Sequence, residues 1–278
     1  MNQHPKEKYI RINGLRLHYL ESGAKSSRPM ILLHGTTDNA HVWDYIRAEV
    51  SAGFRVIALD QRGHGESDRP RPPAYKCEDY VSDLSELVKA LELDGFVLMG
   101  HSMGALHAAR YTSLNPDKVA GLIYVDIEPR PPDWNREYLH KRCHTLPGFY
   151  DSVQDFVDRN RGTNPFSQDE ILFYLAGFAL EERDDGKFYP KFDKEVLGRF
   201  DRYDVREGLV RISCPTLIIR GERSVVMRRK AAEEMNQAVS GSRFVEIPLA
   251  THPAHTDNPT RFQREVMNFL KETRLIDN

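Results

Sequence analysis

The chain begins with alternating apolar and polar residues and then changes to longer apolar runs. Residues 9–12 and 15–20 alternate with period two, and Asn13-Gly14 lies between them. This dipeptide is the strongest short signal for a two-residue hairpin, because both of its residues accept a left-handed backbone. The pattern predicts two antiparallel strands at the start of the chain.

Five later segments are nearly continuous apolar runs, which is typical of strands covered on both faces. They are residues 30–33, 54–59, 96–99, 119–125 and 215–219. Segments with helical periodicity lie between them, at residues 41–52, 77–93 and 103–114. Strands that alternate with helices predict right-handed crossovers and a mostly parallel sheet. Functional groups of such folds collect at the strand ends.

One apolar run ends in a serine that has a glycine two residues away on each side. In Gly100-His101-Ser102-Met103-Gly104 the spacing is G-x-S-x-G, with a strand predicted before it and a helix after it. A sharp strand-to-helix turn makes the serine hydroxyl project from the sheet, and the glycines leave room for that turn. A chance pentapeptide in such a turn is the alternative. We favour a nucleophilic Ser102.

Two other strand ends carry polar loops. His34-Gly35-Thr36-Thr37 follows residues 30–33, and the N–H groups of Thr36 and Met103 are our candidates for an oxyanion hole. An ordinary strand-ending turn is the alternative for this loop.

Residues 60–67 contain charges and glycines but lack the spacing of a phosphate-binding loop. We expect Asp60 and Arg62 to brace this turn by hydrogen bonds. His64 is interpreted as a loop histidine rather than a base.

Together these motifs resemble the α/β-hydrolase superfamily. The likeness spans about residues 9–128 and 215–270. It implies an α/β-hydrolase fold, with a mostly parallel twisted sheet, helices on both faces and a catalytic triad in the chain order serine, acid, histidine. A serine at the elbow separates this chain from the epoxide hydrolases and haloalkane dehalogenases of the fold, which attack through a carboxylate.

The resemblance also selects the histidine. Relatives place it shortly after a strand and seven residues before a proline like Pro259, which selects His252, with His255 as the competitor. A base is needed because a serine hydroxyl is a weak nucleophile until its proton is removed. An imidazole suits that task near neutral pH.

The acid departs from the usual pattern of the superfamily. Most relatives carry it after the seventh strand, where this chain has Ser224 and Val225, and Glu222 is the nearby carboxylate. The sixth strand, however, ends in Asp126. A subset of the superfamily, including the zearalenone lactonases and 2-(acetamidomethylene)succinate hydrolase, places its acid there, and this chain is similar to them. We hypothesise that Asp126 orients His252, with a turn-capping aspartate as the alternative.

The composition changes between the sixth and seventh strands. We expect residues 129–207 to form a mostly helical cap, inserted into a hydrolase core of residues 1–128 and 208–278. Such a lid would cover Ser102 and bind the non-reacting part of the substrate.

Aromatic residues are frequent in the predicted cap, and we interpret most of them as its own core. They are Trp134, Tyr138, Phe149, Phe156, Phe166, Phe173, Tyr174, Phe178, Phe188, Tyr189 and Phe192. Arg130, Arg142 and Arg161 are candidates for binding a substrate carboxylate, with a solvated surface position as the alternative for each.

The composition of the 278 residues narrows the function further. A net charge of −2 favours neither nucleic acid nor an anionic membrane as a partner. Three widely spaced cysteines match neither a disulfide framework nor a zinc spacing, so we expect a reducing, cytoplasmic compartment. No apolar run approaches the length of a membrane helix and no signal peptide pattern opens the chain.

We therefore expect a serine hydrolase that needs no cofactor or metal. It would cleave an ester, lactone or amide of a small molecule through an acyl-enzyme. Carbon–carbon bond hydrolysis or perhydrolysis on the same triad is one alternative. A non-enzymatic ligand receptor that retains the pocket is the other. The oligomeric state is left open.

Overall fold

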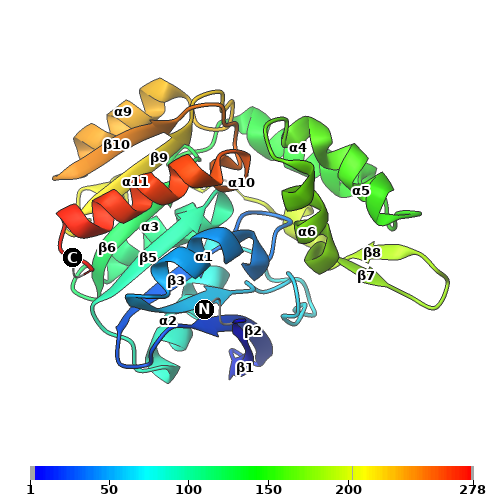
Figure 1. The fold of residues 1–278 in the computed structure, drawn as a ribbon, viewed down its shortest axis with the longest axis horizontal. Coiled ribbons are helices and arrows are strands. Elements are labelled where there is room, and N and C mark those ends of the chain that lie inside the picture. The colour runs from blue at the N-terminus through cyan, green and yellow to red at the C-terminus, as the bar shows by residue number, and fades with distance from the viewer. Residues whose placement is uncertain (1–3, 202, 277–278) are drawn as a thin grey trace.

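The protein is described by a computed structural model that covers residues 4–201 and 203–276. An eight-stranded sheet runs through its centre in the order β1-β2-β4-β3-β5-β6-β9-β10 (Figure 1). The strands are β1 (Lys6–Ile12), β2 (Leu15–Ser22), β3 (Arg28–Leu33), β4 (Phe54–Leu59), β5 (Phe96–His101), β6 (Val119–Val125), β9 (Thr216–Gly221) and β10 (Ser242–Ile247). β2 is antiparallel to both of its neighbours, and all other pairs are parallel.

The predicted opening hairpin is confirmed. Ile12 pairs with Leu15, and the two residues between them, Asn13 and Gly14, have φ angles of +52° and +78°. A tight turn of this kind needs two consecutive residues with positive φ, which Asn-Gly supplies at the lowest steric cost.

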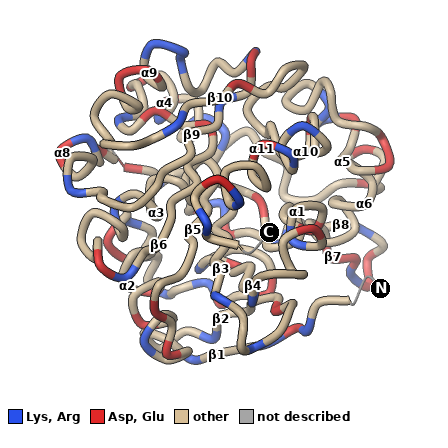
Figure 2. The backbone as a smooth tube through the Cα atoms, turned by 60° about the vertical axis from the view of Figure 1, so that its left-hand side comes forward, with Lys and Arg blue, Asp and Glu red and all other residues tan. Residues whose placement is uncertain are grey.

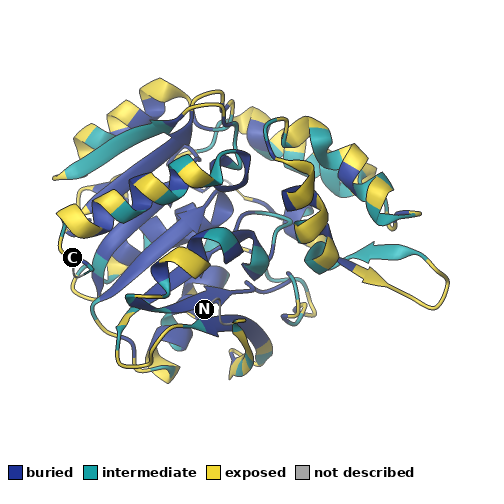
Figure 3. Cartoon of the chain, viewed as in Figure 1, coloured by how far each residue is buried: buried dark blue, intermediate teal, exposed yellow. Residues whose placement is uncertain are grey.

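Helices cover both faces of the sheet, as the alternating pattern predicted. The helices that flank the sheet are α1 (Asp44–Val50), α2 (Cys77–Ala90), α3 (Met103–Leu114), α9 (Arg229–Ala238) and α11 (Pro259–Glu272). α2, α3 and α9 pack on one face and α1 and α11 on the other. Figure 3 shows the central strands buried and the outer faces of the helices exposed.

Two predicted helices differ in length from the observed ones. The segment predicted at 41–52 begins as a 3-10 turn, η1 (Ala40–Trp43), which is capped by the Asn39 side chain accepting a hydrogen bond from His41 N, and continues as α1. α2 ends at Ala90, three residues early, because Glu92 has a left-handed backbone with φ +51°.

The chain between β6 and β9 folds mostly as helices, together with one hairpin that the sequence did not predict. These elements are α4 (Asp133–Thr145), α5 (Val153–Asn160), η2 (Arg161–Thr163), α6 (Asp169–Ala179), β7 (Leu180–Glu182), β8 (Phe188–Pro190), α7 (Glu195–Gly198) and α8 (Arg206–Leu209). α4, α5, α6 and the hairpin lie together beside the sheet (Figure 1). The division into a core of 1–128 and 208–278 and a cap of 129–207 stays a prediction, and its ends at 1–3 and 277–278 lie outside the described residues.

Charged residues of both signs are interspersed over the elements in Figure 2. Among the described residues, none of the helices has the length and apolar character needed to cross a membrane.

Candidate active site

Ser102 lies at a strained turn between β5 and α3. Its backbone has φ +53° and ψ −123°, a conformation that residues other than glycine rarely adopt. The flanking glycines make the turn possible, since a Cβ on Gly100 would lie 2.3 Å from Gly104 O, and a Cβ on Gly104 would lie 2.4 Å from Leu33 O. The predicted strand, elbow and helix are therefore present.

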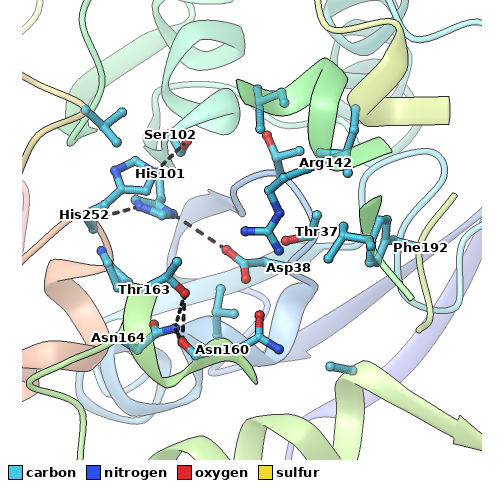
Figure 4. Close-up of a pocket in the computed structure, with 18 of the residues that line it drawn as sticks. Thr37, Asp38, His101, Ser102, Arg142, Asn160, Thr163, Asn164, Phe192 and His252 are labelled. Carbon is cyan, nitrogen blue, oxygen red and sulfur yellow. Dashed lines mark hydrogen bonds and ion pairs between the residues drawn. The ribbon is translucent and has the colours of Figure 1, made fainter. Parts of the chain in front are cut away.

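Three predicted side chains come together at the carboxyl ends of the strands. His252 Nε2 lies 3.0 Å from Ser102 Oγ, and His252 Nδ1 lies 3.1 Å from Asp126 Oδ1. Asp126 follows β6 directly, and His252 lies in the loop after β10 (Figure 4 labels Ser102 and His252). The three groups form one connected hydrogen-bonded relay.

Asp126 is completely buried, and its carboxylate is held from β9 as well as by His252. Oδ2 accepts a hydrogen bond of 2.6 Å from Gly221 N, and Oδ1 accepts one from Ser224 Oγ. Donors of this kind stabilise a buried carboxylate. Ser224, which stands where the family resemblance implies an acid, thus donates to the carboxylate of Asp126.

Glu222, the alternative acid, lies elsewhere. Its side chain is exposed and its Oε2 accepts a hydrogen bond of 3.1 Å from Leu249 N. His255, the alternative histidine, is buried between aromatic rings, with its ring centroid 4.8 Å from that of Trp43. Burial lowers the pKa of His255 to about 3, so it stays neutral.

The loop that carries His252 is fixed by two hydrogen-bonded groups. Asp257 Oδ2 accepts hydrogen bonds from Thr251 N and Thr251 Oγ1, at 2.8 and 2.6 Å. His101 Nε2 lies 3.1 Å from the carbonyl oxygen of His252. His252 is therefore held at its own carbonyl and at the residue before it.

Of the two predicted oxyanion donors, Met103 follows Ser102 in the chain and Thr36 lines the same cavity. Met103 is the first residue of α3, so its N–H has no acceptor within the helix. Thr36 lines the same cavity as Ser102, and no hydrogen bond between described residues uses its N–H. Thr37, the next residue, has φ +71°, so this loop is strained like the elbow.

A cavity of about 610 Å³ opens above Ser102 and extends between α4, α5 and α6 (Figure 4). Leu172, Leu175 and Ala176 of α6 line one part of it, and Asn160, Thr163 and Asn164 make another part polar. Cavities of this size hold small molecules.

The expectation that most cap aromatics form the cap's own core is wrong. None of the eleven is fully buried, and Trp134, Tyr138, Phe156 and Phe192 line the cavity. The apolar cluster of this region consists of Val157, Leu172 and Ala176, with Val153 and Phe156 packed on it. Other aromatic residues of this segment, Tyr150, Phe200 and Tyr203, are buried, and Phe178 stacks on His41 with ring centroids 3.6 Å apart.

The three candidate arginines differ in whether they reach the cavity. Arg142 lines the cavity and donates a hydrogen bond of 3.1 Å to Tyr138 Oη (Figure 4). Arg130 is exposed, and Arg161 is occupied by Ser167 O and the Asp169 carboxylate.

Asp38 is the acidic residue among the described side chains that line the cavity. Its side chain is 34% exposed, and desolvation of the carboxyl group raises its pKa to about 6 against the opposing effect of His252.

The structural role expected for residues 60–67 is confirmed. Asp60 accepts hydrogen bonds from Ala40 N and Glu66 N at 2.6 and 2.9 Å, and Arg62 binds both carboxylate oxygens of Asp83 at 2.6 Å. His64 is buried, and burial lowers its pKa to about 3.

The sequence profile described as "alpha/beta hydrolase fold" matches residues 28–259 of the chain, well over half of its length. The chain belongs to this family.

Named relatives of this hydrolase differ in their activities. Epoxide hydrolase 3 of Xenopus tropicalis is 29% identical over 98% of this chain and 80% of its own length. The non-heme chloroperoxidase of Streptomyces lividans is 36% identical over 93% of this chain and 97% of its own length. The solved structure of E-2-(acetamidomethylene)succinate hydrolase matches with a TM-score of 0.88 and 24% identity over 96% of this chain and 99% of that chain, which supports the shared fold.

Within the described residues, no group of three or more His, Cys, Asp and Glu side chains of this hydrolase is arranged to hold a metal ion. Cys77, Cys143 and Cys214 are unpaired.

Sequence reasoning missed Ser224, Asp257 and Asp38 as parts of the site. Ser224 stands out in the sequence only because an acid is expected at its position, and no neighbouring residue indicates a contact with Asp126. Asp38 lies two residues after Thr36, so its place on the predicted oxyanion loop was the available signal.

Proposed function

We propose that this α/β hydrolase is a serine hydrolase that cleaves an ester, lactone or amide of a small molecule. The observation that carries the proposal is the continuous hydrogen-bonded relay from Ser102 Oγ through His252 to the buried Asp126. Epoxide hydrolases of this fold attack through a carboxylate, whereas the elbow residue of this chain is a serine, Ser102.

In the first step Ser102 Oγ attacks the carbonyl carbon while His252 Nε2 takes the hydroxyl proton. Asp126 holds the Nδ1–H tautomer of His252 and stabilises the imidazolium that forms. The N–H groups of Thr36 and Met103 donate to the developing oxyanion, and each such donor is worth about 3 kcal/mol of barrier.

The tetrahedral intermediate then collapses as the bond to the leaving group breaks and His252 returns its proton to that group. In the second half, water loses a proton to His252 Nε2 and attacks the acyl-enzyme. The bond between the acyl carbon and Ser102 Oγ then breaks, His252 Nε2 returns its proton to Ser102 Oγ, and the carboxylic acid product leaves.

The cavity supports a small-molecule substrate as the partner. Its wall along α6 is apolar and suits an apolar acyl or leaving group, whereas the part lined by Asn160 and Asn164 is polar. A cytoplasmic location stays a prediction from the composition.

A panel of p-nitrophenyl esters, anilides and vinylogous diketones tests the proposal. We expect the esters to be hydrolysed with a burst of p-nitrophenol as the acyl-enzyme forms, and Ser102→Ala to lose at least 1,000-fold in kcat, on the order expected when one member of a triad is removed. Turnover of the diketones alone would favour the carbon–carbon hydrolase.

Perhydrolysis is the second candidate, and the 36% identity to a protein named non-heme chloroperoxidase favours it. Here hydrogen peroxide replaces water in the second half and releases a peracid from the acyl-enzyme. Peracid formation from acetate or butyrate and peroxide, measured with and without Ser102, separates the two candidates.

A further inference from the structure

Asp38 places a carboxyl group next to the reacting atoms. It lies two residues after Thr36 on the loop between β3 and η1, and its Oδ2 is 3.8 Å from Nδ1 of His101, the neighbour of Ser102. Figure 4 shows the Asp38 carboxyl pointing into the cavity that Ser102 and His252 line. The Asp38 carboxyl takes no part in the catalytic steps proposed above.

His101 presents an acceptor to Asp38, not a donor. Its Nε2 faces the carbonyl oxygen of His252 at 3.1 Å, and a carbonyl only accepts, so Nε2 carries the proton. Burial lowers the pKa of His101 well below its usual value, so the ring is neutral and Nδ1 is bare. Nδ1 is buried and has no hydrogen-bond partner among the described residues.

The other charged groups at the cavity leave Asp38 without a donor as well. His252, after β10, directs Nδ1 to Asp126 and Nε2 to Ser102. Arg142 of α4 donates one hydrogen bond to Tyr138, and Arg223, after β9, lies over the ring of Phe166. Among the described residues, neither guanidinium forms an ion pair with Asp38. No hydrogen bond between described residues ends on the Asp38 carboxyl. A donor to it must therefore come from within the cavity.

A ligand that fills the cavity displaces water from this carboxylate. A ligand without a donor then leaves the carboxylate dehydrated and unpaired, a cost that a donor on the ligand avoids. We propose that Asp38 is a specificity-determining residue that accepts a hydrogen bond from a hydroxyl or ammonium group carried beside the scissile carbonyl of the substrate. The inference rests on the proposed serine hydrolase function and names its substrate class. A carboxylate at the same place on the substrate is disfavoured by repulsion.

Three p-nitrophenyl esters with one leaving group test this inference: the butyrate, the 3-hydroxybutyrate and the hemisuccinate. Their kcat/KM values are compared in the wild type, in Asp38→Asn, in Asp38→Ser as a second variant, and in Asp94→Asn as the control. Asp94 is exposed and pairs with Lys118, and it precedes the amino end of β5, whereas the cavity lies at the carboxyl end of that strand. Melting temperatures show that each variant is folded.

At about pH 8 Asp38 is ionised, and we expect the wild type to prefer the hydroxylated ester over the butyrate by about 10-fold or more, the range of a hydrogen bond to a charged group. Asp38→Asn removes most of this preference and raises the rate for the hemisuccinate relative to the butyrate. Asp94→Asn keeps the wild-type ratios.

The pH dependence supplies a second readout. Below about pH 6 the Asp38 carboxyl takes up a proton, so the relative rate for the hemisuccinate rises in the wild type, and it stays level in Asp38→Asn.

The two proposals fail in different ways. Equal losses for all three esters in both Asp38 variants, or unchanged ratios, overturn the specificity role and leave the serine hydrolase in place. No hydrolysis of any ester by the folded wild type overturns the proposed function and this inference together.

Discussion

The carboxyl group of Asp126 connects three parts of the chain that lie far apart in sequence. It meets His252 after β10 and accepts hydrogen bonds from Gly221 and Ser224, which end β9 and follow it. Asp126 itself has φ +48°, so its backbone is strained at the strand end. A buried carboxylate with several donors and a strained backbone is typical of a functional site rather than of a turn cap.

At this scale we predict that Asp126→Asn lowers kcat for the ester by roughly 10,000-fold, because the amide favours the wrong tautomer of His252. Glu222→Gln is the matched control, since Glu222 is exposed and contacts the backbone of Leu249. Steady-state kinetics of the two purified variants decide between them. Loss of turnover in Glu222→Gln with an active Asp126→Asn refutes our assignment.

Individual residues were predictable where the family resemblance supplied their spacing. Ser102, Asp126 and His252 could be chosen from the chain order, and the structure brings those three together. The contact between Ser224 and Asp126 depends on β6 and β9 being neighbours across almost a hundred intervening residues, which no local pattern encodes. The role of Asp38 could not be inferred from the sequence, because it depends on which ring nitrogen of His101 carries the proton.

At the scale of elements, the close approach of α3 to the end of β3 determines whether the Ser102 hydroxyl can project into the cavity. Gly104 allows α3 to approach the backbone of Leu33 and His34, where a Cβ would lie 2.4 and 2.6 Å from their carbonyl oxygens. The periodicity of the strands and of α3 predicted these elements, because both are buried and regular. The β7–β8 hairpin was missed, since its strands have three residues each and, apart from the buried Leu180, half-buried or exposed side chains.

Gly104→Ala is expected to destabilise the protein by about 1–3 kcal/mol through overpacking, and to lower kcat by displacing the elbow. Gly177→Ala in α6 is the control, because nothing lies within 4 Å of the added Cβ. There we expect a gain of about 0.5–1 kcal/mol from helix propensity. Urea unfolding and ester hydrolysis measure both effects, and equal stability changes in the two variants contradict this view of the elbow.

At the scale of the whole molecule, buried histidines couple stability to pH. Burial lowers the pKa values of His64 and His255 to about 3 and those of His101 and His107 well below the usual value. Each ring is neutral in the folded state and takes up a proton on unfolding near an unfolded pKa of about 6.5. The unfolded state thus binds more protons in acid, so stability is complete above about pH 6.5 and falls as the pH decreases toward 3.

We predict that the free energy of unfolding drops by several kcal/mol between about pH 7 and pH 5, with about 2 kcal/mol from each such histidine. Asp38 acts in the opposite direction over part of this range, since its pKa is raised to about 6, but it is one group against these four histidines and the buried His34, whose pKa burial also lowers. Urea unfolding across pH measures the slope. His107→Gln should reduce it, while the exposed His144→Gln should not; a flat profile in the wild type contradicts the prediction.

The central claim is that Ser102 is a nucleophile activated by His252 and Asp126. Reaction with a fluorophosphonate probe followed by peptide mass spectrometry tests it most directly, because only an activated serine forms the adduct. We predict one adduct, on Ser102, that is absent in Ser102→Ala and forms far more slowly in Asp126→Asn. An unlabelled wild type, or labelling that persists in Ser102→Ala, would contradict the account.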